Sequence, residues 1–302
     1  MTSIPYLVLI MTCLAGLFWG ASCEGAYSGN FLIENCNWRR RHFLNNLGAK
    51  VNVSIARFAD HNLSRNLTCI TNIYALEGYL RLKVSRFSLL GSSSCRTSSE
   101  RLKIFHHGLQ TNNYITWCGE TYAEELYFKD TVVLEYNTGL HGEGDGFDIE
   151  VSRVGRPCGN VQTLAVTNKT RLLYSPLYPD PYPHRLDCYY RLLGPGKNLR
   201  IRSLSHDIEW DETCDYDVLQ INQRKFCGSE IIDVLETAQS TDTSVTFSTD
   251  GSYAGAGYVL EYFNEQDLSV VCDGDTSLNP IDLQGGENSH FIELKIKQTG
   301  RR

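Results

Sequence analysis

Apolar and polar residues alternate with a period of two along several short segments of this chain. The clearest alternation lies at residues 80–84, 102–104, 199–202 and 219–221, where leucine, isoleucine or valine is followed by arginine, lysine or glutamine. Such alternation places apolar side chains on the buried face of a β-strand and polar side chains in water. Clusters of Gly, Pro, Asn and Ser separate these segments. The pattern therefore predicts an all-β fold of antiparallel strands in β-sandwiches.

Eight cysteines repeat the same spacing twice. The second and third cysteines of each set are 26 residues apart, from 69 to 95 and from 188 to 214. Each set ends in Cys-Gly, and two alternating apolar runs follow it, the second of which begins with Gly and an aromatic residue. This self-similarity indicates two copies of one module. The two sets are Cys36, Cys69, Cys95 and Cys118, then Cys158, Cys188, Cys214 and Cys227.

The beginning of the chain has the form of a secretory signal. An apolar stretch from Tyr6 to Trp19 is followed by small residues, and we expect residues 1–23 to be removed by cleavage after Cys23. A signal anchor is the alternative. The 11 cysteines and the glycosylation sequons both favour an oxidising, extracellular location, so we expect a secreted glycoprotein. The sequons stand at Asn52, Asn62, Asn66 and Asn168.

Charge divides the chain unevenly. Residues 1–156 hold 15 Lys and Arg against 14 Asp and Glu, whereas residues 157–302 hold 13 against 21, for a net charge of −8. The asymmetry indicates that the two copies have different partners. We predict a divergent first domain at 36–153, a second domain at 158–264 and a C-terminal tail at 265–302.

The second copy resembles the CUB domain, an extracellular antiparallel β-sandwich of the jelly-roll type. The resemblance rests on Cys158-Gly159, Tyr174 to Pro179, Tyr182-Pro183, Cys188 to Tyr190, Gly194 to Gly196, Cys214 to Asp217, Phe226 to Gly228 and Gly257-Tyr258. The first copy keeps the cysteines and strand pattern but lacks the Ser-Pro-x-Tyr-Pro segment. The resemblance implies the pairs Cys36–Cys69, Cys95–Cys118, Cys158–Cys188 and Cys214–Cys227.

A stretch of six carboxylates in eleven residues, 207–217, is the main candidate site. It is either a solvated acidic loop or a cation site, because clustered negative charges repel unless solvent or an ion relieves them. Calcium-binding CUB domains resemble this chain at Glu209, Asp217 and Asp250, and the carbonyl of Ser252 is placed to join them as a Ca²⁺ ligand. The first copy has Leu90, Glu100 and Gly139 at the corresponding positions, so we expect no calcium there.

The resemblance also implies a mode of binding. In calcium-dependent members of the family, the ion orders acidic oxygens against which a Lys or Arg of an extracellular partner protein docks. Tyr216, Glu209 and Asp250 would form that site here, with Asp211, Glu212 and Asp215 adding electrostatic steering. The other interpretation of Tyr216 is a core aromatic residue.

The basic segment 36–118 provides a second candidate surface. It contains 12 Lys and Arg against 3 Asp and Glu, with the densest run at Arg39 to Arg41. It could bind glycosaminoglycan or another carbohydrate, as spermadhesins suggest, or an acidic protein. It could also be cleaved after Arg41. The third interpretation is exposed strand faces balanced by the acidic stretch 119–150. The adjacent pair His106 and His107 lacks further ligands at metal spacing and indicates a simple loop.

No catalytic motif accompanies these features. The sequence contains neither His-Glu-x-x-His nor Gly-x-Ser-x-Gly nor a phosphate-binding glycine loop, so we expect a binding protein and not an enzyme. We expect no nucleic-acid partner and no membrane span in the mature chain. Cys272 either opens a shortened third module or pairs elsewhere, with Cys23 or with a second chain in a disulfide-linked oligomer.

Overall fold

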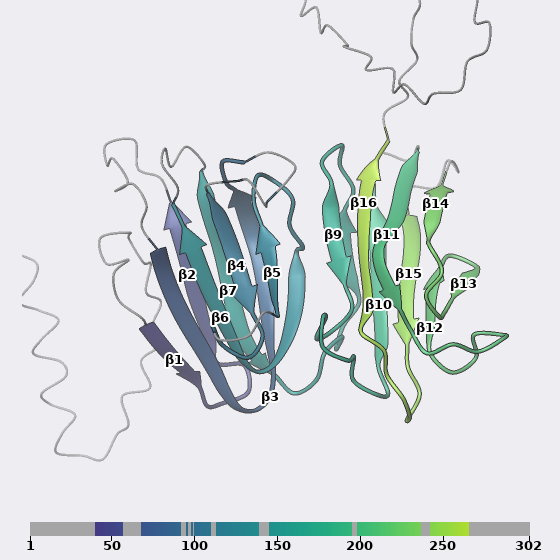
Figure 1. Cartoon of the computed structure of the whole chain (residues 1–302), viewed down its shortest axis with the longest axis horizontal. Coiled ribbons are helices and arrows are strands. Elements are labelled where there is room, and N and C mark those ends of the chain that lie inside the picture. Colours follow the sequence, from purple (N-terminus) through teal and green to yellow (C-terminus); the bar gives the residue numbers. More distant parts are fainter. Residues whose placement is uncertain are drawn as a thin grey trace, which may run out of the picture. The chain divides into compact units, whose positions relative to one another are not determined.

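The strands of the first half of the chain join in one seven-stranded sheet. The computed structural model describes residues 40–56, 68–91, 95, 98, 100–109, 113–138, 145–194, 198–236 and 242–265. The first half comprises β1 (Arg40–Leu44), β2 (Lys50–Ala56), β3 (Thr68–Ser88), β4 (Arg101–Phe105), β5 (Tyr114–Trp117), β6 (Glu125–Asn137) and β7 (Gly146–Val154) (Figure 1).

The second half forms two separate sheets. One contains five strands in the order β13-β12-β15-β10-β8, and the other contains four in the order β14-β11-β16-β9. These strands are β8 (Gln162–Ala165), β9 (Arg171–Tyr174), β10 (Asp187–Leu193), β11 (Leu199–Asp207), β12 (Val218–Ile221), β13 (Arg224–Phe226), β14 (Asp233–Glu236), β15 (Asp242–Ser248) and β16 (Gly257–Asn264) (Figure 1).

Both halves follow the same strand order once the two longest strands of the first are divided. The N-terminal part of β3 pairs with β1 and with the C-terminal part of β6. That part of β6 pairs with β4, and β4 pairs with β5. The rest of β3 pairs with β7, whose other neighbour is β2, and with the start of β6. The two orders, β1-β3-β6-β4-β5 and β2-β7-β3-β6, correspond to β8-β10-β15-β12-β13 and β9-β16-β11-β14.

The continuous β3 explains why the first half forms a single sheet. Its pairing with β6 is interrupted between Tyr74 and Tyr79 and its pairing with β7 between Val84 and Arg86. Such irregularities bend a strand and increase its twist, which lets one strand serve two layers. In the second half the corresponding strands β10 and β11 are separate elements.

The alternation in the sequence correctly predicts the buried faces. Leu80, Leu82, Leu102 and Ile104 are fully buried in the first half, and Leu219 and Ile221 in the second. Trp117, Phe128 and Phe147 are the largest fully buried side chains of the first core, and Tyr182, Phe247, Tyr258 and Tyr262 those of the second. The all-β fold class is therefore confirmed.

Three disulfides lie within the described residues. They join Cys95 to Cys118, Cys158 to Cys188, and Cys214 to Cys227, the pairs that the family resemblance implies. Cys69 is also disulfide-bonded, whereas Cys36, its expected partner, lies outside the described residues. The signal segment, Asn62, Asn66, Cys272 and the tail after Glu265 lie outside them as well. Within the described part of the chain, no helix is long and apolar enough to cross a membrane.

Two of the predicted glycosylation sites are described. Asn52 is half-buried in β2, opposite Glu150 of β7, and Asn168 is exposed between β8 and β9. Glycosylation at both sites stays a prediction.

Candidate metal centre of the second half

Three loops of the second half bring Glu209, Asp217 and Asp250 together. Glu209 follows β11, Asp217 directly precedes β12, and Asp250 follows β15. Because Val218 of β12 pairs with Ser248 of β15, the residues beyond these strand ends meet at the same end of the sheet. Each of the three acids offers a carboxylate oxygen within 4.8 Å of those of the other two.

A buried carboxylate, Asp217, is the centre of this group. Its side chain is 1% exposed, and both of its oxygens accept hydrogen bonds. The hydroxyl of Tyr182 donates to Oδ2 at 2.6 Å, and the backbone N–H of Asp250 donates to Oδ1 at 2.7 Å. The same Tyr182 oxygen accepts from the N–H of Glu209 at 3.0 Å. Asp217 is thus tied directly to the Asp250 loop and, through Tyr182, to the Glu209 loop.

Glu209 carries the least compensated charge of the group. Its Oε2 atom is buried and has no hydrogen-bond partner among the described residues. Desolvation by the surrounding protein raises the pKa of Glu209, and repulsion from Asp217, Asp250 and Asp211 raises it further. A buried carboxylate oxygen without a donor is costly unless a cation or proton relieves it.

The residues fit a calcium ion in chemistry and number. Ca²⁺ prefers carboxylate and carbonyl oxygens, and three converging acids supply half of a typical coordination shell. Ser252, expected to add its carbonyl, is exposed. Its N–H donates to Oδ1 of Asp250 at 2.7 Å, and its hydroxyl lies 3.4 Å from each oxygen of that carboxylate. Ser252 therefore holds Asp250 in position, and its role as a ligand stays a prediction.

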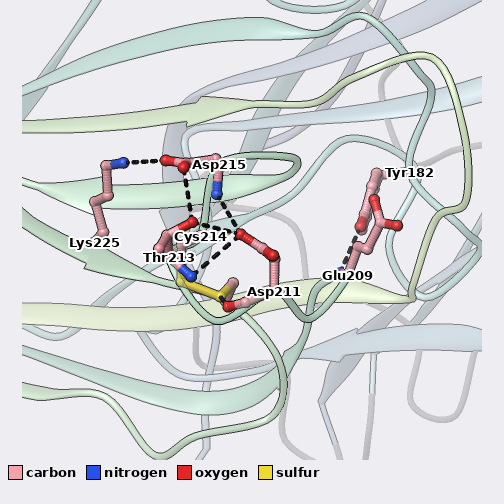
Figure 2. The surroundings of a disulfide bond; sticks show 8 residues. Tyr182, Glu209, Asp211, Thr213, Cys214, Asp215 and Lys225 are labelled. Atoms are coloured by element: carbon pink, nitrogen blue, oxygen red, sulfur yellow. Dashed lines mark hydrogen bonds and ion pairs between the residues drawn. A yellow bond between two sulfur atoms is a disulfide. The ribbon is translucent and has the colours of Figure 1, made fainter.

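The acidic stretch 207–217 does not act as one cluster. Asp211 accepts hydrogen bonds from the N–H groups of Thr213 and Asp215 and from the Thr213 hydroxyl. Asp215 forms an ion pair with Lys225 at 2.8 Å. Figure 2 shows these residues around the Cys214–Cys227 disulfide, with Glu209 and Tyr182 lying apart from them. Asp211 and Asp215 therefore stabilise a local turn. Hydrogen bonds and the ion pair with Lys225 offset their negative charges, so neither carboxylate requires a bound cation.

Tyr216 is exposed and does not belong to the core. Its side chain is 55% accessible, so the interpretation as a core aromatic residue is wrong. It stands next to Asp217 in sequence, on the loop between Cys214 and β12. An exposed aromatic residue at this place is available to a partner, as the binding hypothesis requires.

The first half uses its corresponding carboxylate differently. Glu100 is 1% exposed and accepts hydrogen bonds of 2.5 Å from the N–H of Leu90 and from the hydroxyl of Tyr136. Both oxygens thus have donors inside the protein. Among the described residues, the only group of three or more acids, histidines or cysteines suited to a metal is that of the second half. Gly139 lies outside the described residues.

The histidine pair lies in the loop that follows β4, where both rings contact an acid distant in the sequence. His106 is buried against Phe128, with ring centroids 4.7 Å apart. Both histidines contact the Asp180 carboxylate, at 3.4 Å for His106 Nδ1 and 2.8 Å for His107 Nε2. Burial lowers the pKa of His106 to about 4, although Asp180 acts in the opposite direction. No signal near His106 in the sequence points to an acid more than seventy residues away.

Three basic residues of the first half form ion pairs with acids. Lys50 pairs with Glu150 at 3.0 Å, Arg86 with Asp148 at 2.7 Å, and Lys103 with Glu135 at 3.5 Å. All three acids belong to the stretch 119–150. These pairs support the interpretation of the basic segment as balanced strand faces. Of the dense run, Arg41 is exposed and Arg39 lies outside the described residues.

Comparison with known proteins identifies the class of the second half. Residues 158–262 match the family model of the CUB domain, so the chain contains one CUB domain over this range.

Relatives of the chain are proteins that contain CUB domains. Cubilin of Canis lupus familiaris is 24% identical over 212 residues, which is 64% of this chain and 6% of cubilin. The bone morphogenetic protein 1 homolog of Strongylocentrotus purpuratus is 24% identical over 214 residues, which is 66% of this chain and 32% of that protein. The chain thus spans less than a third of these relatives.

Solved structures that resemble the chain do so at low TM-scores. The match to the CUB1-EGF-CUB2 domains of rat MASP-1 covers 74% of this chain and 100% of that structure's chain. The sequence identity is 18% and the TM-score is 0.30. The match to the MASP-1 CUB2 domain bound to Ca²⁺ covers 35% of this chain and 97% of that structure's chain. The sequence identity is 28% and the TM-score is 0.29.

Proposed function

We propose that this protein is a secreted, non-enzymatic binding glycoprotein whose CUB domain binds Ca²⁺ and docks a lysine or arginine of an extracellular protein. Glu209, Asp217 and Asp250 would hold the ion, with the Ser252 carbonyl as a further ligand. The observation that carries the proposal is the convergence of three carboxylates, each with an oxygen within 4.8 Å of the others, together with a buried Glu209 oxygen that has no donor among the described residues.

The electrostatics of the group support a divalent cation. Three like charges at this separation repel one another, and the burial of Asp217 limits how far water can screen them. A bound Ca²⁺ replaces repulsion by attraction and is the largest local charge in such a site. Since each carboxylate comes from a different loop, the ion would also fix the three loops relative to one another.

The docking residues follow from the same arrangement. The carboxylates of Glu209 and Asp250 are only partly buried, so they keep a face toward solvent that a basic side chain can reach. Tyr216, exposed beside Asp217, adds an aromatic surface. A charged hydrogen bond from lysine or arginine to an ordered carboxylate is stronger than a neutral one. Partner binding would therefore depend on calcium.

We further propose that the first half is a divergent copy of the module that forms the second half. The matching strand orders of the two halves support this, including the parallel pairs β1 with β3 and β8 with β10. In this copy the Glu100 carboxylate is satisfied by Leu90 and Tyr136 and would hold no calcium. The ion pairs of Lys50, Arg86 and Lys103 leave less free positive charge for a glycosaminoglycan, so we do not favour that function.

A binding experiment with the secreted chain tests the proposal. The immobilised protein is exposed to extracellular fluid in calcium or in chelator, and retained proteins are identified. We expect specific proteins that elute with chelator and are lost with Glu209→Ala but kept with Glu236→Ala, a matched change on β14 of the same half. Retention that persists in chelator and also occurs on heparin resin would contradict the proposal and favour glycosaminoglycan binding.

A further inference from the structure

An open cleft adjoins the candidate metal centre on the side of β11. Its volume is about 480 Å³, and its walls include Asp207, Glu209, Trp210, Gly228 and Tyr253. Glu209 is shared with the acid group, whereas the other four residues belong to no function described above. The cleft thus extends the candidate site beyond the three carboxylates.

Two aromatic side chains of this cleft are unusually exposed. Trp210 is 72% and Tyr253 77% accessible, and these are among the largest exposures of any aromatic residue in the described chain. Exposed tryptophan and tyrosine are typical of binding surfaces, where they supply large contact areas with few rotatable bonds.

The indole of Trp210 packs on a glycine, and Tyr253 has an uncommon backbone conformation. Gly228 has φ +70°, and a Cβ built there would lie 2.9 Å from Cδ1 of Trp210, so the indole packs directly on this glycine. Tyr253 has φ 48°, in the left-handed region that residues other than glycine, asparagine and aspartate rarely adopt. Backbone strain of this kind concentrates at functional sites. The exposed phenol is therefore presented by a costly conformation.

The charge of the cleft selects for a cation. Asp207 and Glu209 lie in its wall, and among the described residues no lysine, arginine or histidine lines it. Asp207 Oδ2 accepts the N–H of Ala256 at 2.9 Å, which fixes that carboxylate. The faces of tryptophan and tyrosine attract cations through their ring quadrupoles. Aromatic rings beside carboxylates suit guanidinium, which stacks flat on a ring and donates to a carboxylate, better than the compact ammonium group.

We propose that this cleft binds an arginine side chain of the protein partner, stacked on Trp210 and Tyr253 and paired with Asp207. The inference rests on the proposed function, in which a basic residue docks at the calcium site, and adds a second, neighbouring subsite. A suitable partner therefore presents two basic groups on one surface, one for the ion-ordered carboxylates and an arginine for the cleft.

The test uses small probes with the full secreted chain. Acetyl-arginine amide, acetyl-lysine amide and methyl glucoside are titrated in calcium, and their binding is followed by saturation-transfer NMR. We expect the arginine probe to bind most tightly, with its signal on the side-chain methylenes and guanidinium. Equal or tighter binding of the lysine probe or the glucoside at the same residues would overturn the assignment, as would no arginine signal at all.

Variants locate the probe. Tyr253→Gly removes the ring and suits the left-handed backbone, and Trp210→Leu removes the indole; Tyr189→Ala changes a half-exposed tyrosine of the same domain outside the cleft. We expect each of the first two changes to weaken arginine binding about two- to fivefold, as for a single exposed cation–π contact, and Tyr189→Ala to have no effect. Arginine binding that is the same in all three variants contradicts the proposal.

Calcium titrations of the same variants separate the two proposals. Trp210→Leu and Tyr253→Gly should bind calcium as the unaltered chain does. If the unaltered chain binds no calcium, the proposed function fails, whereas the arginine titration still decides whether the cleft exists as a subsite. If calcium binds normally and the arginine probe does not, only the cleft assignment fails.

Discussion

The hydroxyl of Tyr182 donates a hydrogen bond of 2.6 Å to the buried carboxylate of Asp217. Because the same oxygen accepts the N–H of Glu209, one phenol links two of the three acids of the candidate metal centre. Tyr182 belongs to the second core, where its ring meets Phe247 edge to face with centroids 5.1 Å apart. The geometry of the acids is thus set from the hydrophobic core beneath them.

Because of this link, Tyr182→Phe tests whether the Tyr182 hydroxyl holds Asp217 and Glu209 in position. The change keeps the ring but removes the hydroxyl, which leaves Asp217 Oδ2 and the Glu209 N–H without their partner. We expect a loss of about 1–3 kcal/mol in the free energy of unfolding and weaker calcium binding. Urea unfolding with and without calcium measures both effects. Tyr189→Phe is the control, and equal stability and calcium affinity in the two variants would argue against the link.

The first half allows a complementary prediction at Glu100. Its carboxylate is buried and accepts from Leu90 and Tyr136, so Glu100→Ala leaves both donors unsatisfied. We expect about 1–3 kcal/mol of destabilisation, with no change in the number of calcium ions bound. Denaturant unfolding and a calcium titration test the two parts. The exposed Glu77→Gln serves as the control, and a loss of bound calcium in Glu100→Ala would show that the first half holds an ion.

The sequence predicts the framework of this protein well. Alternating residues such as Leu80, Leu82, Leu219 and Ile221 mark buried strand faces, because side chains in a strand project to opposite sides in turn. The family resemblance also places Glu209, Asp217 and Asp250, which the structure brings together. These features depend on local pattern or on motifs at fixed spacing.

Features that depend on distant pairing could not be predicted in this way. The contact of His106 and His107 with Asp180 joins segments with no shared pattern. The acidic stretch 207–217 is likewise divided between the metal centre and a local turn. This division depends on Lys225 of β13, which forms an ion pair with Asp215. The exposure of Tyr216 follows from the path of a loop, on which the sequence imposes no period. In each case tertiary structure decides the role of the residue.

The buried His106 gives the chain a predicted dependence of stability on pH. Burial lowers its pKa in the folded state from 6.5 to about 4, so the unfolded chain binds more protons between these values. Stability from this group is therefore present above about pH 6.5 and is lost as the pH falls toward 4. The neighbouring charged groups are His107 and Asp180.

Unfolding of the unaltered chain and of His106→Phe between pH 7.5 and 4.5 measures this effect. Phenylalanine fills the site beside Phe128 without a titrating group, so we expect the variant to lose less stability than the unaltered chain on acidification. His184→Gln, at an exposed position outside these contacts, is the control. Parallel pH profiles of His106→Phe and the unaltered chain would contradict the role given to His106.

Calorimetric titration of the secreted chain with calcium tests the central claim most directly. We predict that one ion binds per chain, that Glu209→Gln weakens binding at least tenfold (about 1.4 kcal/mol), and that Glu212→Gln leaves it unchanged. The absence of calcium binding at millimolar concentration, or equal affinity in the two variants, would contradict the assignment of Glu209, Asp217 and Asp250 as the metal centre.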